Sequence, residues 1–173
     1  MSDLRANSLV LGGDAGPEPR WGTITELLGE AADRYGPKEF LRFSDGSLSF
    51  AATEGRSGRL AQVLAGHGIR AGDRVAIMMD NVTDWPLAWL AVLKAGAIAV
   101  PVNPRYRQSD LAFVLRDSGT SLVLAAPPYA DLVREVGAEC GTVREVCTPQ
   151  ELAPELAGPG PGHPLPRPGP ADD

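Results

Sequence analysis

The sequence predicts an α/β fold in which helices cover both faces of a layered parallel or mixed sheet. Three short runs are continuously apolar, RVAIMM (74–79), AIAVPV (97–102) and SLVLAA (121–126), and a segment with helical periodicity follows each run. Strands that are apolar on both faces are typical of a sheet covered by helices. The chain between the runs is long enough for the crossover helix that neighbouring parallel strands require.

A helix and a hairpin are expected before these strands. Apolar residues recur at helical spacing over 24–35, and Thr23 with Glu26 has the form of a capping box, which satisfies free N–H groups at a helix start. Asp45-Gly46 is a strong signal for a tight hairpin turn. The strands that flank this turn are 39–43 and 47–50.

The remaining helices alternate with the apolar strands. Pro86 fits the first turn of a helix, where its missing N–H has no partner to lose, and Ser109 is expected to cap the next helix. Glycines at 68, 96 and 119 are placed to end helices in the left-handed conformation. The expected ranges are a helix ending near His67, helices at 84–95, 109–118 and 128–137, and a last strand at 143–147.

The chain divides into three regions by composition. Residues 1–22 are expected to form an irregular arm, because glycine and proline interrupt them repeatedly. Residues 23–150 carry the α/β pattern and form the folded unit. Residues 151–173 are expected to be a Pro/Gly-rich linker or disordered tail, because they hold few apolar side chains to offset the entropy of ordering.

Composition excludes several classes of protein. The 173-residue chain has a formal net charge of −6, which disfavours nucleic acid as a partner because phosphate binding requires a basic face. No apolar run approaches the length of a membrane-spanning helix. The start of the chain lacks the basic and long apolar regions of a signal peptide, and Cys140 and Cys147 form no CxxC motif. We therefore expect a cytoplasmic protein with two inert thiols.

The sequence contains no recognisable catalytic or metal-binding motif. Its two lysines, Lys38 and Lys94, lie outside any Gly-rich loop, and Lys94 is expected to face the last carbonyls of its helix. His67 is expected to cap or pack at a helix end, and His163 lies in the Pro-rich tail. GxSxG and HExxH are absent. No catalytic residue and no metal ligand are assigned.

One loop stands out as a binding candidate. Residues 101–106, Pro-Val-Asn-Pro-Arg-Tyr, follow an apolar strand, and ligands of open α/β sheets lie beyond the carboxyl ends of strands. Two prolines restrict the exit from the strand and present Arg105 at the tip of the loop. The alternative is an exposed loop with an ordinary surface arginine.

Several segments together resemble the N-terminal region of the adenylate-forming, AMP-dependent acyl-CoA synthetases (acid–CoA ligases), relatives of luciferases and of peptide-synthetase adenylation domains. They are TITELLGEAADRYG, SLSFAATEGRSGRLAQVL, GIRAGDRVAIMMDN and AWLAVLKAGAIAVPVNPRYRQSDLAFVLRDSG. The resemblance covers roughly 23–126 and weakens towards 147. Asp80 stands where proline is common in the family, and the acid that usually follows the pair filled here by Ser49-Phe50 is missing.

The resemblance implies a two-step reaction that uses ATP, Mg²⁺ and CoA, in which an acid becomes an acyl-adenylate and then a thioester. The family's phosphate loop and catalytic lysine lie downstream of the matching region. The resemblance therefore implies an N-terminal fragment, with the incomplete fold of one subdomain, that is inactive alone and binds none of these cofactors by itself. In some members an arginine in the Asn-Pro-Arg context contacts the nucleotide phosphate of CoA, which makes Arg105 the one cofactor-binding candidate.

Whether this chain acts in an enzyme stays open at this point. The alternative is a non-catalytic α/β module that keeps the fold in order to bind a partner or a CoA-like ligand. The expected partners are the downstream ligase subdomains, with self-association as a further expectation, because helix 85–95 is apolar around most of its circumference. An unrelated flavodoxin-like domain is disfavoured, since the turn Ala71-Gly72-Asp73 precedes its strand.

Overall fold

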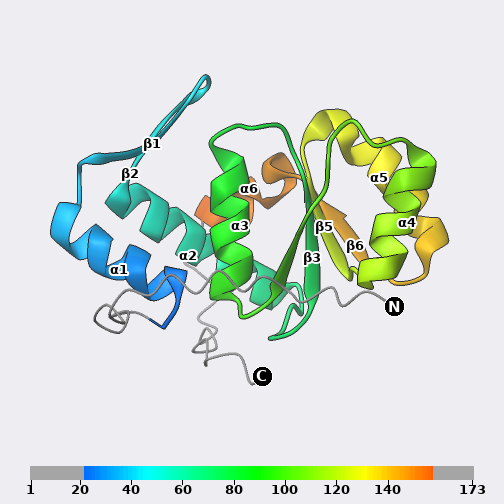
Figure 1. Ribbon diagram of the computed structural model, residues 1–173, viewed down its shortest axis with the longest axis horizontal. Helices are drawn as coiled ribbons and strands as arrows, with labels where there is room; N and C mark the ends of the chain where they lie inside the picture. The colour runs from blue at the N-terminus through cyan, green and yellow to red at the C-terminus, as the bar shows by residue number, and fades with distance from the viewer. Residues whose placement is uncertain (1–21, 158–173) are drawn as a thin grey trace, which may run out of the picture.

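The computed structural model describes residues 22–157, which form a parallel sheet between two helical layers, with a helix and a hairpin beside one of these layers (Figure 1). The sheet order is β4-β3-β5-β6 and every neighbouring pair is parallel. Of the two arrangements that the sequence left open, the main sheet is the parallel one. Its strands are β3 (Arg74–Met78), β4 (Ile98–Pro101), β5 (Leu122–Ala125) and β6 (Glu145–Cys147).

Alternation along the two central strands explains why both faces need a helical layer. Val75 and Ile77 of β3 belong to one apolar cluster, whereas Ala76 and Met78 belong to the other. The first cluster includes residues of α2 (Phe50–Gly66), α3 (Asp84–Lys94) and α6 (Pro149–Ala157). The second includes residues of α4 (Gln108–Ser118) and α5 (Pro127–Cys140). Successive side chains of a strand point to opposite faces, so each central strand contributes to both cores.

The N-terminal elements lie beside α2 and α3 and outside the main sheet (Figure 1). Helix α1 (Ile24–Tyr35) starts with the expected capping box, in which the Thr23 hydroxyl accepts from the Glu26 N–H and the Glu26 carboxylate accepts from the Thr23 N–H. Strands β1 (Glu39–Phe43) and β2 (Gly46–Ser49) form an antiparallel hairpin around the expected turn. The rings of Phe40 and Phe50 stack at a centroid distance of 4.4 Å, which ties the hairpin to α2.

Helix α6 corrects the expected linker or tail at 151–173. Thr148 and Glu151 form a second capping box, because the Thr148 hydroxyl accepts from the Glu151 N–H and the Glu151 carboxylate accepts from the Thr148 N–H. Pro149 occupies the first helical position, where a missing N–H costs little. Leu152 is buried and Leu156 packs against the same core. The rest of the expected tail and residues 1–21 of the expected arm lie outside the described residues.

The ends of several other elements differ from expectation by a few residues. Helix α4 starts at Gln108, one residue early, because the Arg107 carbonyl accepts from the Leu111 N–H, so Ser109 lies within the first turn and caps nothing. Helix α5 is longer than expected at both ends, and β6 is shorter than the expected strand at its start. Between residues 22 and 157, no helix is long and apolar enough to cross a membrane.

Candidate functional site

The carboxyl edge of the sheet collects the polar loops of this fold. The chain passes from β3 to β4 on one side and then returns to β5 on the other side of β3. In parallel sheets such a reversal opens a crevice beyond the strand ends, where ligands bind. The loops after β3, β4 and β5 therefore frame the place where this fold is best suited to hold a ligand.

A direct contact joins the two sides of this crevice. The Tyr129 hydroxyl, in the first turn of α5, donates to Asp80 Oδ2 after β3 over 2.7 Å. This hydrogen bond, followed by burial and the Asp80 charge, raises the pKa of Tyr129, whereas the charge of Arg105 lowers it. The charges of Asp80 and Arg105 thus both act on the Tyr129 hydroxyl. Tyr129 was missed by sequence reasoning, because its relation to Asp80 depends on strand order.

Arg105 lies where the sequence places it, at the tip of the loop after β4. Its backbone N–H donates to Asn103 Oδ1 over 3.0 Å, and the Tyr106 N–H donates to the Asn103 carbonyl over 3.0 Å. Arg105 is exposed, and within residues 22–157 its guanidinium forms no ion pair. The loop is anchored by its backbone while the charged end stays available, which suits a phosphate ligand.

An open hollow of about 310 Å³ adjoins this loop. Its lining combines apolar and polar side chains from the ends of β3 and β4 and the start of α3: Met79, Asp80, Asn81, Trp85 and Pro104. This hollow is wide open to solvent.

A second hollow of about 200 Å³ lies between α2, α3 and α6 and is mainly apolar. Arg56, Arg59 and Asp84 are the charged residues in its lining. Burial, followed by the charge of Asp45, raises the pKa of Asp84, and Arg56 opposes this rise. The lining thus combines side chains of both charge signs with a mainly apolar surface.

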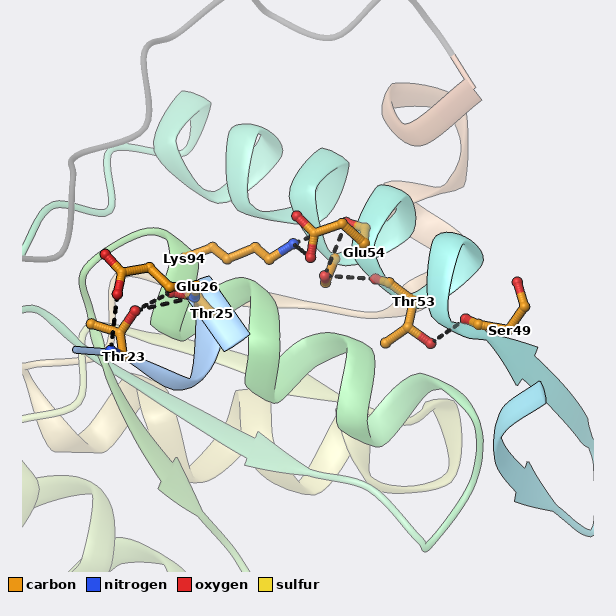
Figure 2. Close-up of polar contacts among 8 residues, drawn as sticks. Thr23, Thr25, Glu26, Ser49, Thr53, Glu54 and Lys94 are labelled. Atoms are coloured by element: carbon orange, nitrogen blue, oxygen red, sulfur yellow. Dashed lines mark hydrogen bonds and ion pairs between the residues drawn. The ribbon is translucent and has the colours of Figure 1, made fainter. Parts of the chain in front are cut away.

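Lys94 is not available for phosphate chemistry. Instead of facing the last carbonyls of α3, its buried side chain crosses to α2, where Nζ lies 2.7 Å from Glu54 Oε2 and donates to the Glu54 carbonyl over 2.9 Å (Figure 2). The contact between Lys94 Nζ and Glu54 Oε2 is an ion pair, but its angles do not meet those of a hydrogen bond. The expected position of Lys94 is therefore wrong, and the residue joins two helices.

A separate polar cluster surrounds His67, where α2 ends. Nδ1 of His67 lies 2.9 Å from Glu145 Oε2 of β6, and Nε2 lies 3.2 and 3.3 Å from the two carboxylate oxygens of Glu155 on α6. Burial would lower the pKa of His67, but the hydrogen bonds to the two carboxylates outweigh it and raise that pKa. Burial, followed by the nearby Glu145, raises the pKa of Cys147 to about 12.

Sequence reasoning missed this cluster as a group. It treated His67 as a helix-end residue and Cys147 as an inert thiol, because 78 positions separate His67 from Glu145. The only available signal was the alternation Glu-Val-Cys on an edge strand, which places the first and third side chains on one face.

The comparisons with known proteins point to one family of enzymes. A family model described as AMP-binding enzyme matches residues 28–166. A long-chain-fatty-acid–CoA ligase of Salmonella typhimurium is 35% identical over 118 residues, which are 68% of this chain and 21% of the relative. Tyrocidine synthase 3 of Brevibacillus parabrevis is 33% identical over 68% of this chain and 2% of its own length.

Solved structures give the same result. A fatty acyl CoA synthetase of Mycobacterium tuberculosis superposes with a TM-score of 0.73 at 28% identity, over 82% of this chain and 30% of that chain. The N-terminal domain of FACL13 from Mycobacterium tuberculosis superposes with a TM-score of 0.71 at 28% identity, over 80% of this chain and 38% of that chain. The chain thus spans about a fifth of the Salmonella ligase and about a third of the matched structures.

Proposed function

Because the chain belongs to the AMP-binding enzyme family, we propose that it serves as the N-terminal part of an ATP-dependent acyl-CoA ligase. In that reaction a carboxylate oxygen attacks the α-phosphorus of ATP and pyrophosphate leaves. The thiol of CoA then attacks the acyl carbonyl, and AMP leaves as the thioester forms. The names of several relatives favour a fatty acid as the substrate, whereas a tyrocidine synthase matches an equal share of this chain.

The residues of this chain do not fit a complete site for ATP and Mg²⁺. A phosphate loop needs several glycine N–H groups and a free lysine, and neither lysine of this sequence lies in such a loop. Lys94 is bound to Glu54, and the Asp80 carboxylate already accepts from Tyr129. No step of the reaction is therefore assigned to residues of this chain.

We accordingly propose that the 173-residue chain alone does not adenylate carboxylic acids. Adenylation needs preorganised positive charge around the transferring phosphoryl group, and such groups typically contribute two to three orders of magnitude in rate each. The measurement is pyrophosphate exchange with a panel of acids, with a complete acyl-CoA ligase as positive control. Exchange above the protein-free blank that follows the chain through purification would contradict the proposal.

Within this function, we propose that Arg105 binds the nucleotide phosphate of CoA. The observation that carries the proposal is the exposed guanidinium on a backbone-anchored loop at the carboxyl edge of the sheet. Charge-assisted hydrogen bonds of a guanidinium to phosphate are worth roughly 1.5–3 kcal/mol, so we expect a preference of roughly ten- to a hundredfold for CoA over dephospho-CoA.

Since the complete cofactor site is not expected in this chain, the test is an NMR titration, which detects the weak local contact of a single side chain, with both ligands added to the original sequence and to Arg105→Gln. Arg107→Gln is the matched control, because Arg107 is also exposed and lies two residues away. The preference for CoA should disappear in Arg105→Gln and persist in Arg107→Gln. If both variants prefer CoA over dephospho-CoA to the same extent, the preference comes from the overall surface charge, and the proposed role of Arg105 is refuted.

A further inference from the structure

We propose that His67, Glu145 and Cys147 form a binding site for a zinc-like divalent transition-metal ion. One donor atom from each of these residues lies within 4.8 Å of the others. The site shares no residue with the carboxyl-edge loops. It is independent of the proposed ligase function, so either proposal can fail alone.

The fold brings these three side chains together from two elements, the end of α2 and the edge strand β6. Glu145 and Cys147 are alternate residues of β6, so they project from the same face of that strand. His67 terminates α2, whose buried face belongs to the same apolar cluster as Cys147. Residues of α2 and α6 belong to the apolar cluster on the face of the sheet that includes Cys147, so these two helices bring His67 and Glu155 to that face.

The set of donors selects the kind of ion. A cysteine sulfur and an imidazole nitrogen favour zinc and its neighbours, whereas magnesium and calcium require oxygen ligands throughout. Donors around one tetrahedral zinc ion lie about 3.3–3.8 Å apart, given metal–ligand distances of about 2.0–2.3 Å. The 2.9 Å contact between His67 Nδ1 and Glu145 Oε2 therefore has to open by under an ångström.

Protons balance as the ion binds. The Cys147 thiol releases its proton to become a thiolate, and the proton shared between His67 Nδ1 and Glu145 is released so that both atoms coordinate the ion. Glu145 and His67 are partly exposed, with side-chain accessibilities of 42% and 18%, so solvent reaches the site. Water is then the fourth ligand.

Glu155 completes the arrangement without binding the ion. Its two carboxylate oxygens lie 3.2 and 3.3 Å from His67 Nε2, where they can accept the N–H of that nitrogen and leave Nδ1 to coordinate the ion once its proton is released. Metal-binding histidines generally donate their second N–H to a carboxylate in this way, and loss of that partner typically lowers metal affinity ten- to a hundredfold. The second nitrogen of His67 already has this partner.

The test uses the full 173-residue chain, freed of metal with a chelator and kept reduced. Zinc affinity is measured by chelator competition, and Co²⁺ serves as a spectroscopic probe. We expect one ion per chain, with tetrahedral Co²⁺ absorption and a thiolate-to-metal charge-transfer band. Cys147→Ser and His67→Gln should each lower the affinity at least about a hundredfold, and Glu155→Gln about tenfold.

The control variant is Cys140→Ser, which removes the other thiol, on α5, and should leave metal binding unchanged. The Co²⁺ spectrum of the unaltered chain decides the question even if a variant fails to fold. Absence of a charge-transfer band, or an affinity unaffected by Cys147→Ser in a folded variant, would overturn the proposal and leave a hydrogen-bonded cluster only.

Discussion

Gly119 shows how one backbone conformation joins a helix end to the sheet. It ends α4 with φ +62°, and the Arg74 side chain of β3 donates to the Ser118 and Gly119 carbonyls over 2.8 Å each. A Cβ at this position would lie 2.7 Å from Arg74 Nη2. The glycine therefore both adopts the left-handed conformation and makes room for the guanidinium that covers the free carbonyls.

We predict that Gly119→Ala lowers the free energy of unfolding by more than the roughly 1–2 kcal/mol that a left-handed residue costs. The displaced Arg74 hydrogen bonds supply the additional loss. Gly72→Ala is the control, because Gly72 has φ +82° with no atom within 4 Å of an added Cβ, and so reports the backbone cost alone. Urea unfolding compares the two, and equal losses would show that the Arg74 contacts contribute nothing.

The structural role of a single residue could be predicted where it depends on neighbours in the sequence. The Thr23 capping box and the Gly119 helix end depend on residues within one turn, and both are confirmed. Lys94 and His67 were not predictable, because their partners Glu54 and Glu145 lie 40 and 78 positions away. Such pairs follow from how helices and strands pack, which periodicity does not specify.

At the scale of elements, the hairpin is attached to α3 by one carboxylate. Asp45, in the turn between β1 and β2, accepts from the Thr83 N–H over 3.2 Å and from the Thr83 hydroxyl over 2.8 Å, immediately before α3. The hydrogen bond from the Thr83 hydroxyl is the main cause that lowers the pKa of Asp45. Burial opposes this effect, and the hydrogen bond from the Thr83 N–H adds to it. The hairpin turn thus holds Thr83, which lies 38 residues later in the chain and directly precedes α3.

We predict that this attachment depends on pH. Since the pKa of Asp45 is lower in the folded chain than in the unfolded one, its stabilisation is complete above the unfolded pKa of roughly 3.9 and is lost as pH falls through the folded pKa. Asp45→Ala should therefore lower the urea midpoint at neutral pH and cease to do so in strong acid. The exposed Asp117→Ala serves as control, and a pH-independent effect of Asp45→Ala would contradict the mechanism.

Strands and hairpin were predictable as elements, whereas α6 was not. The continuously apolar runs at β3 and β5 mark strands that are buried on both faces, and Asp45-Gly46 marks the turn. Helix α6 was hidden by the surrounding proline and glycine, including Pro154 inside the helix itself. The capping box at Thr148 and the proline after it were the available signals for a helix. The high proline and glycine content of the segment nevertheless led to the prediction of a linker or tail.

At the scale of the whole molecule, much of the apolar surface that the sequence predicted to be exposed is covered by the chain itself. Helix α3, which is apolar around most of its circumference, is enclosed by α2, the sheet and α1, and its Leu87, Leu90 and Val92 are buried. One wholly apolar hollow of about 320 Å³ remains between α1, the hairpin and α3. Ile24, Leu27 and Phe40 in its lining are 47%, 40% and 41% exposed.

We predict that this hollow makes the chain self-associate and bind a hydrophobic dye. Clustered apolar side chains at a surface usually mark a contact site, whereas single exposed ones are ordinary. A polar substitution inside the hollow should therefore reduce self-association and dye binding more than one at an isolated apolar residue. Leu27→Gln should reduce both dye fluorescence and the concentration-dependent mass in sedimentation. Phe113→Gln, at a residue that is 67% exposed and not part of this hollow, should change neither. A chain that stays monomeric at high concentration, melts cooperatively and leaves the dye unbound would have a closed surface, and would favour an independent α/β binding module over a ligase subdomain that awaits its partner.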